Sequence, residues 1–222
     1  MLTLYYAADT ISLATLIVLE EVGASYEAVR IDFSKTEQRS PEYLKINPKG
    51  RMPALVTDQG ILTETPAMLV YLAQQFGRRD LALIDDPFAF AQVQSVNSYF
   101  CSSLHINHSH RMRGTRWVDA ADKAAIAAMQ RHVPASVGAN YDLIESDMLK
   151  GPWVMGERFT ICDPYLFTLT GWLESDGVDK ASFPKCHAHY KRMVERPAVQ
   201  RALAEQYAGL PIEGGIDFLN SR

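Results

Sequence analysis

Two short motifs between residues 47 and 68 together suit the binding of a small anionic peptide. The first is Met52-Pro53, which stands between a glycine-containing loop and the apolar run of residues 54–56. Because proline has no N–H, it is tolerated where a strand begins, and a tight turn there can use a cis peptide bond. The second is Glu64-Thr65-Pro66, which is typical of a helix start, with Thr65 as the N-cap and Pro66 at the first helical position. Free N–H groups and the positive dipole end of such a helix favour a carboxylate.

This ordered pair of motifs closely resembles the glutathione-binding half of the cytosolic glutathione transferases, which has a thioredoxin-like fold. In that family the residue before the cis-proline, here Met52 beside Pro53, pairs with the backbone of the glutathione cysteine. An acidic residue and a hydroxyl at the following helix start, here Glu64 and Thr65, hold the γ-glutamyl end. Lys35 stands where the family often has a basic residue near the glycine carboxylate; the alternative is an ordinary solvated lysine. The resemblance implies glutathione as co-substrate.

The chemistry implied by this resemblance belongs in the loop between Tyr6 and Ser12, which joins a strand to a helix N-terminus. A thiol such as that of glutathione has a pKa of about 8.5, so little of it is ionised at neutral pH. A hydroxyl donor and a helix dipole directed at the sulfur can lower that pKa by roughly two units, or about 2.7 kcal/mol. Ser12 is the first candidate donor, Tyr6 is its rival and Thr10 is a third. A plain N-cap role for Ser12 and a structural role for Tyr6 remain open.

The same loop is similar to that of the beta-class bacterial transferases, whose motif is a tyrosine, a short loop and then Cys-Ser-Leu. Tyr6 falls on the tyrosine and Ser12 on the serine, whereas Ile11 stands in place of the cysteine. Without a thiol at that position, disulfide exchange of the glutaredoxin kind is not expected. Activation of the glutathione thiol by a hydroxyl is still compatible with these residues.

A second segment of chemical interest, residues 105–116, contains three histidines and three arginines. The histidine spacings of three and two place these rings on different sides of a helix, and no Asp, Glu or Cys joins them, so we predict no metal site. By the resemblance, His105 matches the beta-class histidine near the sulfur and the second-substrate site. His108, Arg111 and Arg113 would then line a substrate pocket that attracts anions. The alternative is a polar helix end whose basic residues suit the helix dipole.

The elements that position these residues follow from hydrophobic periodicity and turn signals. The N-terminal part predicts strands at 2–6, 26–31, 54–56 and 61–63, and helices from Ser12, from Ser40-Pro41 and from Thr65 to Gly77. This βαβαββα order is thioredoxin-like α/β, and the remainder predicts an all-α domain. We expect a glutathione-binding domain at 1–77, a linker at 78–87 and a helical substrate domain at 88–222 that ends in a tail from Gly209. Thr160 with Asp163 predicts a helix-capping box.

Composition sets the class of protein. The chain has 222 residues, 47% hydrophobic and 22% charged, with a formal net charge of −4. These values are typical of a globular protein and argue against a general nucleic-acid binder. The sequence has no apolar run long enough for a membrane span and no signal peptide. Three cysteines without CxxC spacing predict free thiols in a reducing compartment, hence a cytoplasmic protein. They are Cys101, Cys162 and Cys186.

These observations predict a glutathione transferase that activates the glutathione thiol for attack on a small electrophile, as in detoxification. The resemblance also implies a homodimer. One alternative is a non-catalytic module of the same fold that binds a ligand or a protein. Another keeps the enzyme but changes the reaction to glutathione-dependent peroxide reduction, isomerisation or dehalogenation, because these reactions share the thiolate and differ in a pocket of scattered apolar residues.

Overall fold

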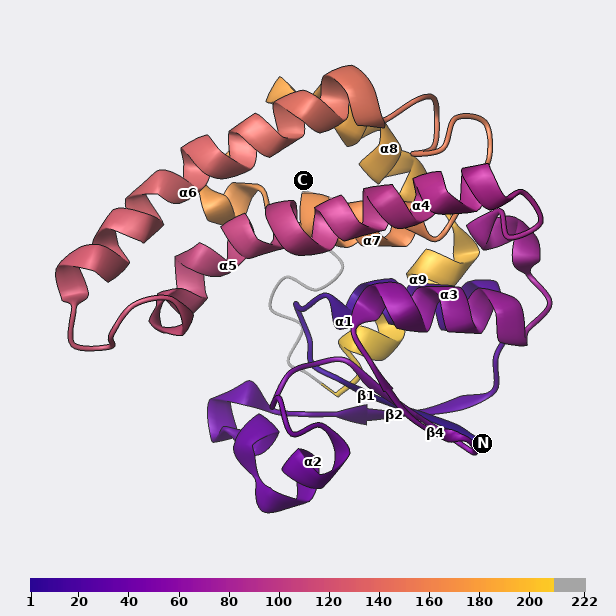
Figure 1. Ribbon diagram of the computed structural model, residues 1–222, viewed down its shortest axis with the longest axis horizontal. Coiled ribbons are helices and arrows are strands. Elements are labelled where there is room, and N and C mark those ends of the chain that lie inside the picture. The colour runs from indigo at the N-terminus through magenta and orange to yellow at the C-terminus, as the bar shows by residue number, and fades with distance from the viewer. Residues whose placement is uncertain (210–222) are drawn as a thin grey trace. The chain divides into compact units, whose positions relative to one another are not determined.

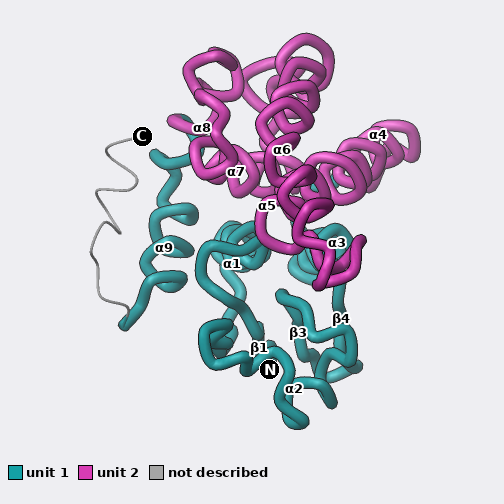
Figure 2. The backbone as a smooth tube through the Cα atoms, turned by 90° about the vertical axis from the view of Figure 1, so that its left-hand side faces the viewer, with its two compact units in different colours: residues 1–82, 192–222 teal, residues 83–191 magenta. Residues whose placement is uncertain are grey.

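The computed structural model describes residues 1–209, which divide into two compact units (Figures 1 and 2). Unit 1 comprises Met1–Ala82 with the C-terminal segment that begins at Arg192, and unit 2 comprises Leu83–Lys191. The break between the units falls within residues 78–87, and the domain limits expected from the sequence stay a prediction. The tail expected from Gly209 lies, apart from that residue, outside the described part of the chain.

Unit 1 is built on a four-stranded mixed sheet in the order β2-β1-β3-β4. Strand β1 pairs in parallel with β2, and the β1–β3 and β3–β4 pairs are antiparallel. Figures 1 and 2 show α1 and α3 on one side of the sheet and α2 on the other. The predicted βαβαββα order and the thioredoxin-like fold are therefore confirmed. The elements are β1 (Leu2–Tyr6), α1 (Ser12–Glu21), β2 (Tyr26–Arg30), α2 (Pro41–Ile46), β3 (Ala54–Thr57), β4 (Gly60–Thr63) and α3 (Thr65–Gln75).

The ends of these helices follow capping chemistry, with two changes from expectation. The Ser40 hydroxyl accepts from the Tyr43 N–H and caps α2 as predicted, and Gly23, at φ 66°, ends α1 in the left-handed conformation that favours glycine. However, the N-cap positions of α1 and α3 are Ile11 and Glu64, one residue earlier than Ser12 and Thr65. The chain enters each helix by a backbone turn, so the predicted capping residues become the first residues inside the helix.

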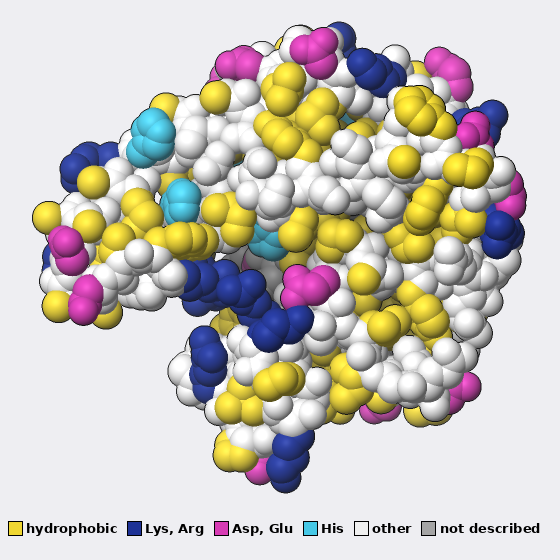
Figure 3. Space-filling view, in the orientation of Figure 1, with side chains coloured by type: hydrophobic (Ala, Val, Ile, Leu, Met, Phe, Trp, Pro, Cys, Tyr) yellow, Lys and Arg dark blue, Asp and Glu magenta, His cyan; other side chains and the backbone are white. Residues whose placement is uncertain are grey.

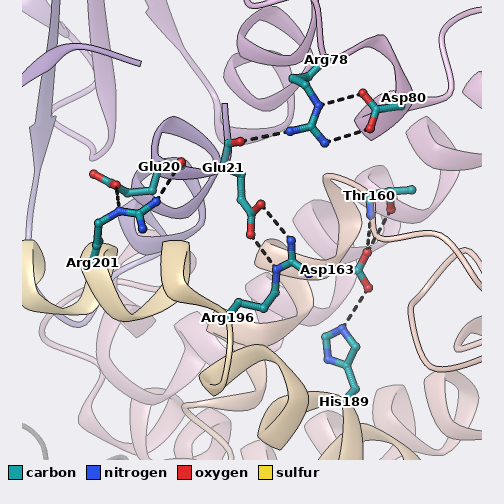
Figure 4. Close-up of polar contacts among 9 residues, drawn as sticks. All are labelled: Glu20, Glu21, Arg78, Asp80, Thr160, Asp163, His189, Arg196 and Arg201. Carbon is teal, nitrogen blue, oxygen red and sulfur yellow. Dashed lines mark hydrogen bonds and ion pairs between the residues drawn. The ribbon is translucent and has the colours of Figure 1, made fainter. Parts of the chain in front are cut away.

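A further helix, α9 (Pro197–Gln206), belongs to unit 1 although it lies far along the sequence. It packs against α1, and two ion pairs fix its beginning there (Figure 4). Arg196 binds the Glu21 carboxylate through two N–H···O contacts of 2.6 and 2.9 Å, and Arg201 Nε lies 2.6 Å from Glu20. The sequence pattern did not indicate that this helix completes the N-terminal unit.

Unit 2 is helical, as expected. A π-helical turn at Phe100–Leu104 joins α4 to α5, and a second one at Ile144–Met148 extends α6. Helix α6 contains Pro134 and continues through it. The helices are α4 (Pro87–Tyr99), α5 (His105–Arg113), α6 (Lys123–Leu143), α7 (Cys162–Thr170) and α8 (Pro184–Val194), whose last residues belong to unit 1. Among the described residues, no helix is long and apolar enough to span a membrane.

The start of α7 is held by the buried carboxylate of Asp163 (Figure 4). It accepts from the Thr160 N–H at 2.6 Å and the Thr160 hydroxyl at 3.2 Å, which is the Asp163 half of the predicted box, but the N-cap of α7 is Ile161 and not the expected Thr160. It also accepts from the Val154 N–H at 2.8 Å and lies 3.0 Å from His189 Nε2. One carboxylate therefore ties α7, α8 and the loop before α7 together.

Replacing this carboxylate should destabilise the protein more than removing an ordinary helix cap. Asp163→Ala leaves buried N–H groups without an acceptor, so we expect a loss of about 3 kcal/mol in the free energy of unfolding, measured by urea denaturation. The control is Asp122→Ala, which removes the exposed N-cap of α6 and should cost about 1 kcal/mol. Equal losses in the two variants would contradict a central role for Asp163.

Candidate functional site

The loop between β1 and α1 brings two of the predicted hydroxyls together. Thr10 Oγ1 lies 2.7 Å from the Ala7 carbonyl and 2.8 Å from Ser12 Oγ. A carbonyl only accepts, so the Thr10 hydroxyl donates to Ala7, and the Ser12 hydroxyl in turn donates to Thr10. The backbone N–H of Ser12 also points at Thr10 Oγ1, at 3.3 Å. The two hydroxyls therefore form one connected chain of hydrogen bonds at the N-terminus of α1.

Burial separates the roles open to these hydroxyls. Ser12 is 0% exposed, whereas Thr10 is partly exposed, and Ile11 between them is buried. Thr10 is therefore the more solvent-accessible of the two hydroxyl residues, and Ser12 is covered. In the sequence, the helix start and the beta-class motif favoured Ser12 over Thr10. The solvent exposure of each hydroxyl decides whether a ligand can reach it, and this exposure depends on the parts of the chain that pack over the loop.

Tyr6 has a partner of its own. Its side chain is only 2% exposed, and its hydroxyl donates to the Glu205 carbonyl at 3.0 Å, at the end of α9. Burial raises the pKa of Tyr6, the negative charge of Glu205 adds to this rise, and Arg30 partly opposes it. The phenol therefore stays protonated at neutral pH, and its proton is directed at α9.

The backbone edge predicted at Met52-Pro53 is present. The Met52–Pro53 peptide bond is cis, and β3 begins directly after it. The preceding carbonyl, that of Arg51, accepts from the Tyr43 hydroxyl and from the Asn47 side-chain amide, both at 2.7 Å. Burial raises the pKa of Tyr43 to about 12, so this donor keeps its proton across the neutral range. Two buried side chains thus fix the chain where Met52 precedes the sheet.

The start of α3 combines an exposed carboxylate with a strained backbone. Glu64 has φ 72° and ψ 113°, a conformation that costs a non-glycine residue about 1–3 kcal/mol. Its carboxylate is 55% exposed and pairs with Lys49 Nζ, which also donates to the Thr63 hydroxyl at 2.7 Å. Thr65 is buried, at 5% exposure. Sequence reasoning missed Lys49, although it lies in the loop before Met52, because its pairing across the β3–β4 hairpin depends on the fold.

Lys35 lies at the end of a short 3₁₀ turn, Phe33–Lys35, in unit 1. Its side chain is 72% exposed, and Nζ is 3.4 Å from the Asp32 carboxylate. A pair this exposed contributes little to stability.

The predicted histidines and arginines belong to unit 2, and a buried carboxylate that the sequence reasoning missed holds two of them. Asp176 receives Arg111 Nε at 2.8 Å and also binds His108 Nδ1. Its side chain is fully buried.

The other two predicted residues of this segment are His105 and Arg113. His105 lies edge-on to Tyr165, and its ring centroid is 5.5 Å from that of Trp172. Arg113, the last residue of α5, is half-buried, and Figure 3 shows histidine side chains over α5 and α6.

The pairing with Asp176 changes the charge expected along α5. Asp176 pairs with Arg111 and also binds His108, so the charge of Arg111 is balanced within unit 2. The carboxylate lies 65 positions from Arg111 in the sequence, so no local pattern could have indicated it. Among residues 1–209, no group of three His, Cys, Asp or Glu side chains is placed to hold a metal ion. Burial raises the pKa of the Cys162 and Cys186 thiols, which keeps them protonated and unreactive.

The strain at Glu64 predicts an unusual response to glycine. Glu64→Gly and Glu64→Ala both delete the ion pair with Lys49, but glycine tolerates the positive φ at this position. The free energy of unfolding of the Glu64→Gly variant should therefore exceed that of the Glu64→Ala variant by about 1 kcal/mol. Glu42 lies in the first turn of α2, where glycine lowers helix stability relative to alanine. The Glu42→Gly variant should therefore be less stable than the Glu42→Ala variant by a similar amount. Urea denaturation of the four variants measures whether the difference between the glycine and alanine variants has opposite signs at the two positions. The same order of stability at both positions would contradict backbone strain at Glu64.

Comparison with known proteins agrees with this geometry. Residues 1–74 match the family model "Glutathione S-transferase, N-terminal domain", and residues 121–197 match the corresponding C-terminal domain model. The glutathione S-transferase GstA of Escherichia coli O157:H7 is 30% identical over 91% of this chain and 98% of its own length. The disulfide-bond oxidoreductase YfcG of Escherichia coli K12 is 26% identical over 94% of this chain and 97% of its length.

Solved structures show the same likeness. A glutathione transferase homologue from Sulfitobacter with bound glutathione superposes with a TM-score of 0.88 at 43% identity, covering 92% of this chain and 98% of the other. The beta-class transferase of Sphingomonas chungbukensis gives 0.80 at 28% identity, covering 94% and 100%. With both family domains matched and the fold shared throughout, the chain belongs to the glutathione S-transferase family.

Proposed function

We propose that this protein is a glutathione transferase that binds glutathione on unit 1 and activates its thiol for attack on a small electrophile. The observation that carries the proposal is the Thr10–Ser12 hydroxyl pair at the N-terminus of α1, in the loop that resembles the beta-class motif. The glutathione bound to the Sulfitobacter homologue supports the choice of ligand.

Glutathione is a peptide with two carboxylates and one thiol, and unit 1 offers a partner for each part. The backbone of Met52, ahead of cis-Pro53, pairs with the cysteine residue of the ligand. The start of α3 receives the γ-glutamyl end through its N–H groups, with the Thr65 hydroxyl on the carboxylate and Glu64 on the ammonium group. Lys35 meets the glycine carboxylate. Lys49 keeps the Glu64 carboxylate in place until the ligand arrives.

Activation of the thiol follows from the hydroxyl chain. When glutathione loses its thiol proton to solvent, the Thr10 hydroxyl turns from the Ala7 carbonyl to the sulfur, and the Ser12 hydroxyl continues to donate to Thr10. Hydrogen bonds to the charged form lower its pKa, and the dipole of α1 acts in the same direction. The thiolate then forms a carbon–sulfur bond with the electrophile as the leaving group departs with its electron pair.

The second substrate is expected on unit 2, near His105 and Arg113, where positive charge suits an electrophile that bears an acidic group. Asp176 holds His108 and Arg111 in fixed positions beside them. From the family alone, we also propose a cytoplasmic homodimer.

A binding module without catalysis is the second candidate, because relatives of this chain include the transcriptional regulator URE2 of Saccharomyces cerevisiae, 25% identical over 84% of this chain and 63% of that protein. Reactions of the same thiolate, namely peroxide reduction, isomerisation or dehalogenation, remain alternatives within the enzyme reading. Ile11 leaves the loop without a thiol, so a disulfide reaction like that of YfcG would need glutathione to supply the sulfur.

Titrating the thiolate absorbance of bound glutathione tests the proposal. The wild-type midpoint should lie about two pKa units below the free value of roughly 8.5. Thr10→Val and Ser12→Ala should each raise it by about one unit, because each removes a member of the hydrogen-bond chain. Ser182→Ala, at an exposed serine of unit 2, is the control and should leave the midpoint unchanged. A normal wild-type midpoint, with binding confirmed by calorimetry, would favour the binding module.

Thr65→Ala tests the carboxylate site separately. We expect glutathione affinity, measured by calorimetry, to fall roughly 10- to 100-fold, since a hydrogen bond to a charged group contributes about 1.5–3 kcal/mol. The thiol midpoint of the bound ligand should stay at the wild-type value. The control is Thr57→Ala, which removes a hydroxyl that bonds the Gly60 carbonyl in the β3–β4 turn. Full affinity in Thr65→Ala would move the γ-glutamyl end away from the start of α3.

A further inference from the structure

The C-terminal end of α9 is capped by side chains from the sheet of unit 1. The last carbonyls of a helix lack intrahelical partners and need donors from elsewhere. The Tyr6 hydroxyl donates to the Glu205 carbonyl at 3.0 Å, and Arg30 donates to the Ala208 carbonyl at 2.7 Å. Tyr6 and Arg30 are paired in the parallel register of β1 and β2, so both donors stand at the C-terminal ends of two adjacent strands. The end of α9 is thus fixed beside the strand that leads into the hydroxyl loop.

A third contact runs from α9 to the loop itself. The Tyr207 hydroxyl lies 2.6 Å from Asp9 Oδ1, and since the ionised carboxylate only accepts, the phenol donates. Asp9 adopts φ 55°, a left-handed conformation that is uncommon for a residue other than glycine, although aspartate tolerates it better than most. Its neighbour is Thr10, whose hydroxyl meets Ser12. A contact from outside the loop therefore holds the residue whose backbone turns Thr10 into position.

The other end of α9 makes this contact rigid. Arg196 and Arg201 tie the beginning of α9 to Glu21 and Glu20 at the end of α1 (Figure 4). Between these anchors, apolar residues of α9 such as Val199 and Leu203 are buried. Helix α9 is thus attached to α1 at one end and to the loop that begins α1 at the other.

We propose that Tyr207 is a positioning residue for thiol activation: through Asp9 it holds residues 7–11 in the conformation that presents the Thr10 hydroxyl to the glutathione sulfur. Tyr6 supports the same arrangement by capping α9, which gives this tyrosine a role other than direct contact with the sulfur. The inference rests on the proposed function of unit 1. It gives the C-terminal end of α9 a part in the thiol chemistry of a loop near the N-terminus. The contacts that connect them, Tyr207–Asp9 and Tyr6–Glu205, join residues 198 and 199 positions apart in the sequence.

The consequence is a specific loss of activation with retained binding. Without the Tyr207 hydroxyl, Asp9 relaxes from its left-handed conformation and Thr10 samples orientations in which it does not reach the sulfur. The proposed contacts for the ligand's carboxylates, at Lys35 and the start of α3, lie outside this loop. Glutathione should therefore bind with nearly unchanged affinity but with a smaller fraction of thiolate.

The experiment compares Tyr207→Phe with Tyr99→Phe by thiolate titration of bound glutathione in the full-length protein. The Tyr99 hydroxyl donates to Asn140 Oδ1 at 2.7 Å in unit 2, so its variant also loses a tyrosine hydrogen bond, but one that involves neither α9 nor the loop. We expect Tyr207→Phe to raise the thiol midpoint by about half a unit, which lowers the thiolate fraction about threefold at a pH below both midpoints. Affinity by calorimetry should change less than twofold, and Tyr99→Phe should keep the wild-type midpoint.

Asp9→Ala supplies an independent variant and a double-mutant cycle. If Tyr207 acts through Asp9, the double variant should show no greater midpoint shift than the single variants. A wild-type midpoint in Tyr207→Phe, an equal shift in Tyr99→Phe, or additive shifts in the double variant would each overturn the inference. If the wild-type protein itself shows no lowered midpoint, the proposed thiol activation fails first, and that result is distinct from a failure of the Tyr207 contact alone.

Discussion

Helix α1 is buried over eight consecutive residues, from Ser12 to Leu19, so neighbours must cover it in every direction. The sheet and α3 cover part of its surface, and α9 covers another part. Because a helix buried on all sides cannot shift without opening several contacts at once, its N-terminus is a fixed point in unit 1. The Thr10–Ser12 hydroxyl pair stands at that point, and so do the contacts that reach it from α9.

Backbone strain in unit 1 occurs beside the same candidate chemistry. Asp9 and Glu64 both have positive φ, one in the hydroxyl loop and the other at the start of α3. Such conformations persist only where the surroundings over-determine them. Tyr207 holds Asp9, and Lys49 pairs with Glu64, so a side-chain bond accompanies each strained residue. In both places the strained backbone directs an adjacent hydroxyl residue, Thr10 or Thr65.

Buried carboxylates organise unit 2 in a comparable way. Asp163 joins the start of α7 to α8 through His189, and Asp176 joins a short turn to α5 through His108 and Arg111. A buried charge is costly unless it is paired and hydrogen-bonded, so each carboxylate requires its partners to stay in place. Asp176 therefore orders the basic segment of α5 and at the same time reduces the positive charge that it can offer to a ligand.

Much of unit 1 could be predicted from local sequence. Strand alternation, the Ser40 cap and Gly23 determine where the elements lie, because these signals act within a few residues. The Met52-Pro53 and Glu64-Thr65 motifs indicated the family for the same reason: their spacing along the chain is short. Helices α1 and α3 begin at Ser12 and Thr65 as expected, but their N-cap positions are Ile11 and Glu64, which enter the helices by backbone turns that side-chain type does not reveal.

Tertiary structure decided the contacts between distant segments. Burial covers Ser12 more than Thr10, the end of α9 takes the Tyr6 hydroxyl, and Asp176 takes Arg111. Each of these outcomes depends on which surfaces meet after folding, and no pattern within a few residues carries that information. The sequence by itself therefore determined the order of elements, the family and the candidate hydroxyls. Only the tertiary structure decided which hydroxyls are accessible and which are held by other parts of the chain, because hydrogen-bond partners and solvent exposure are properties of the packed molecule.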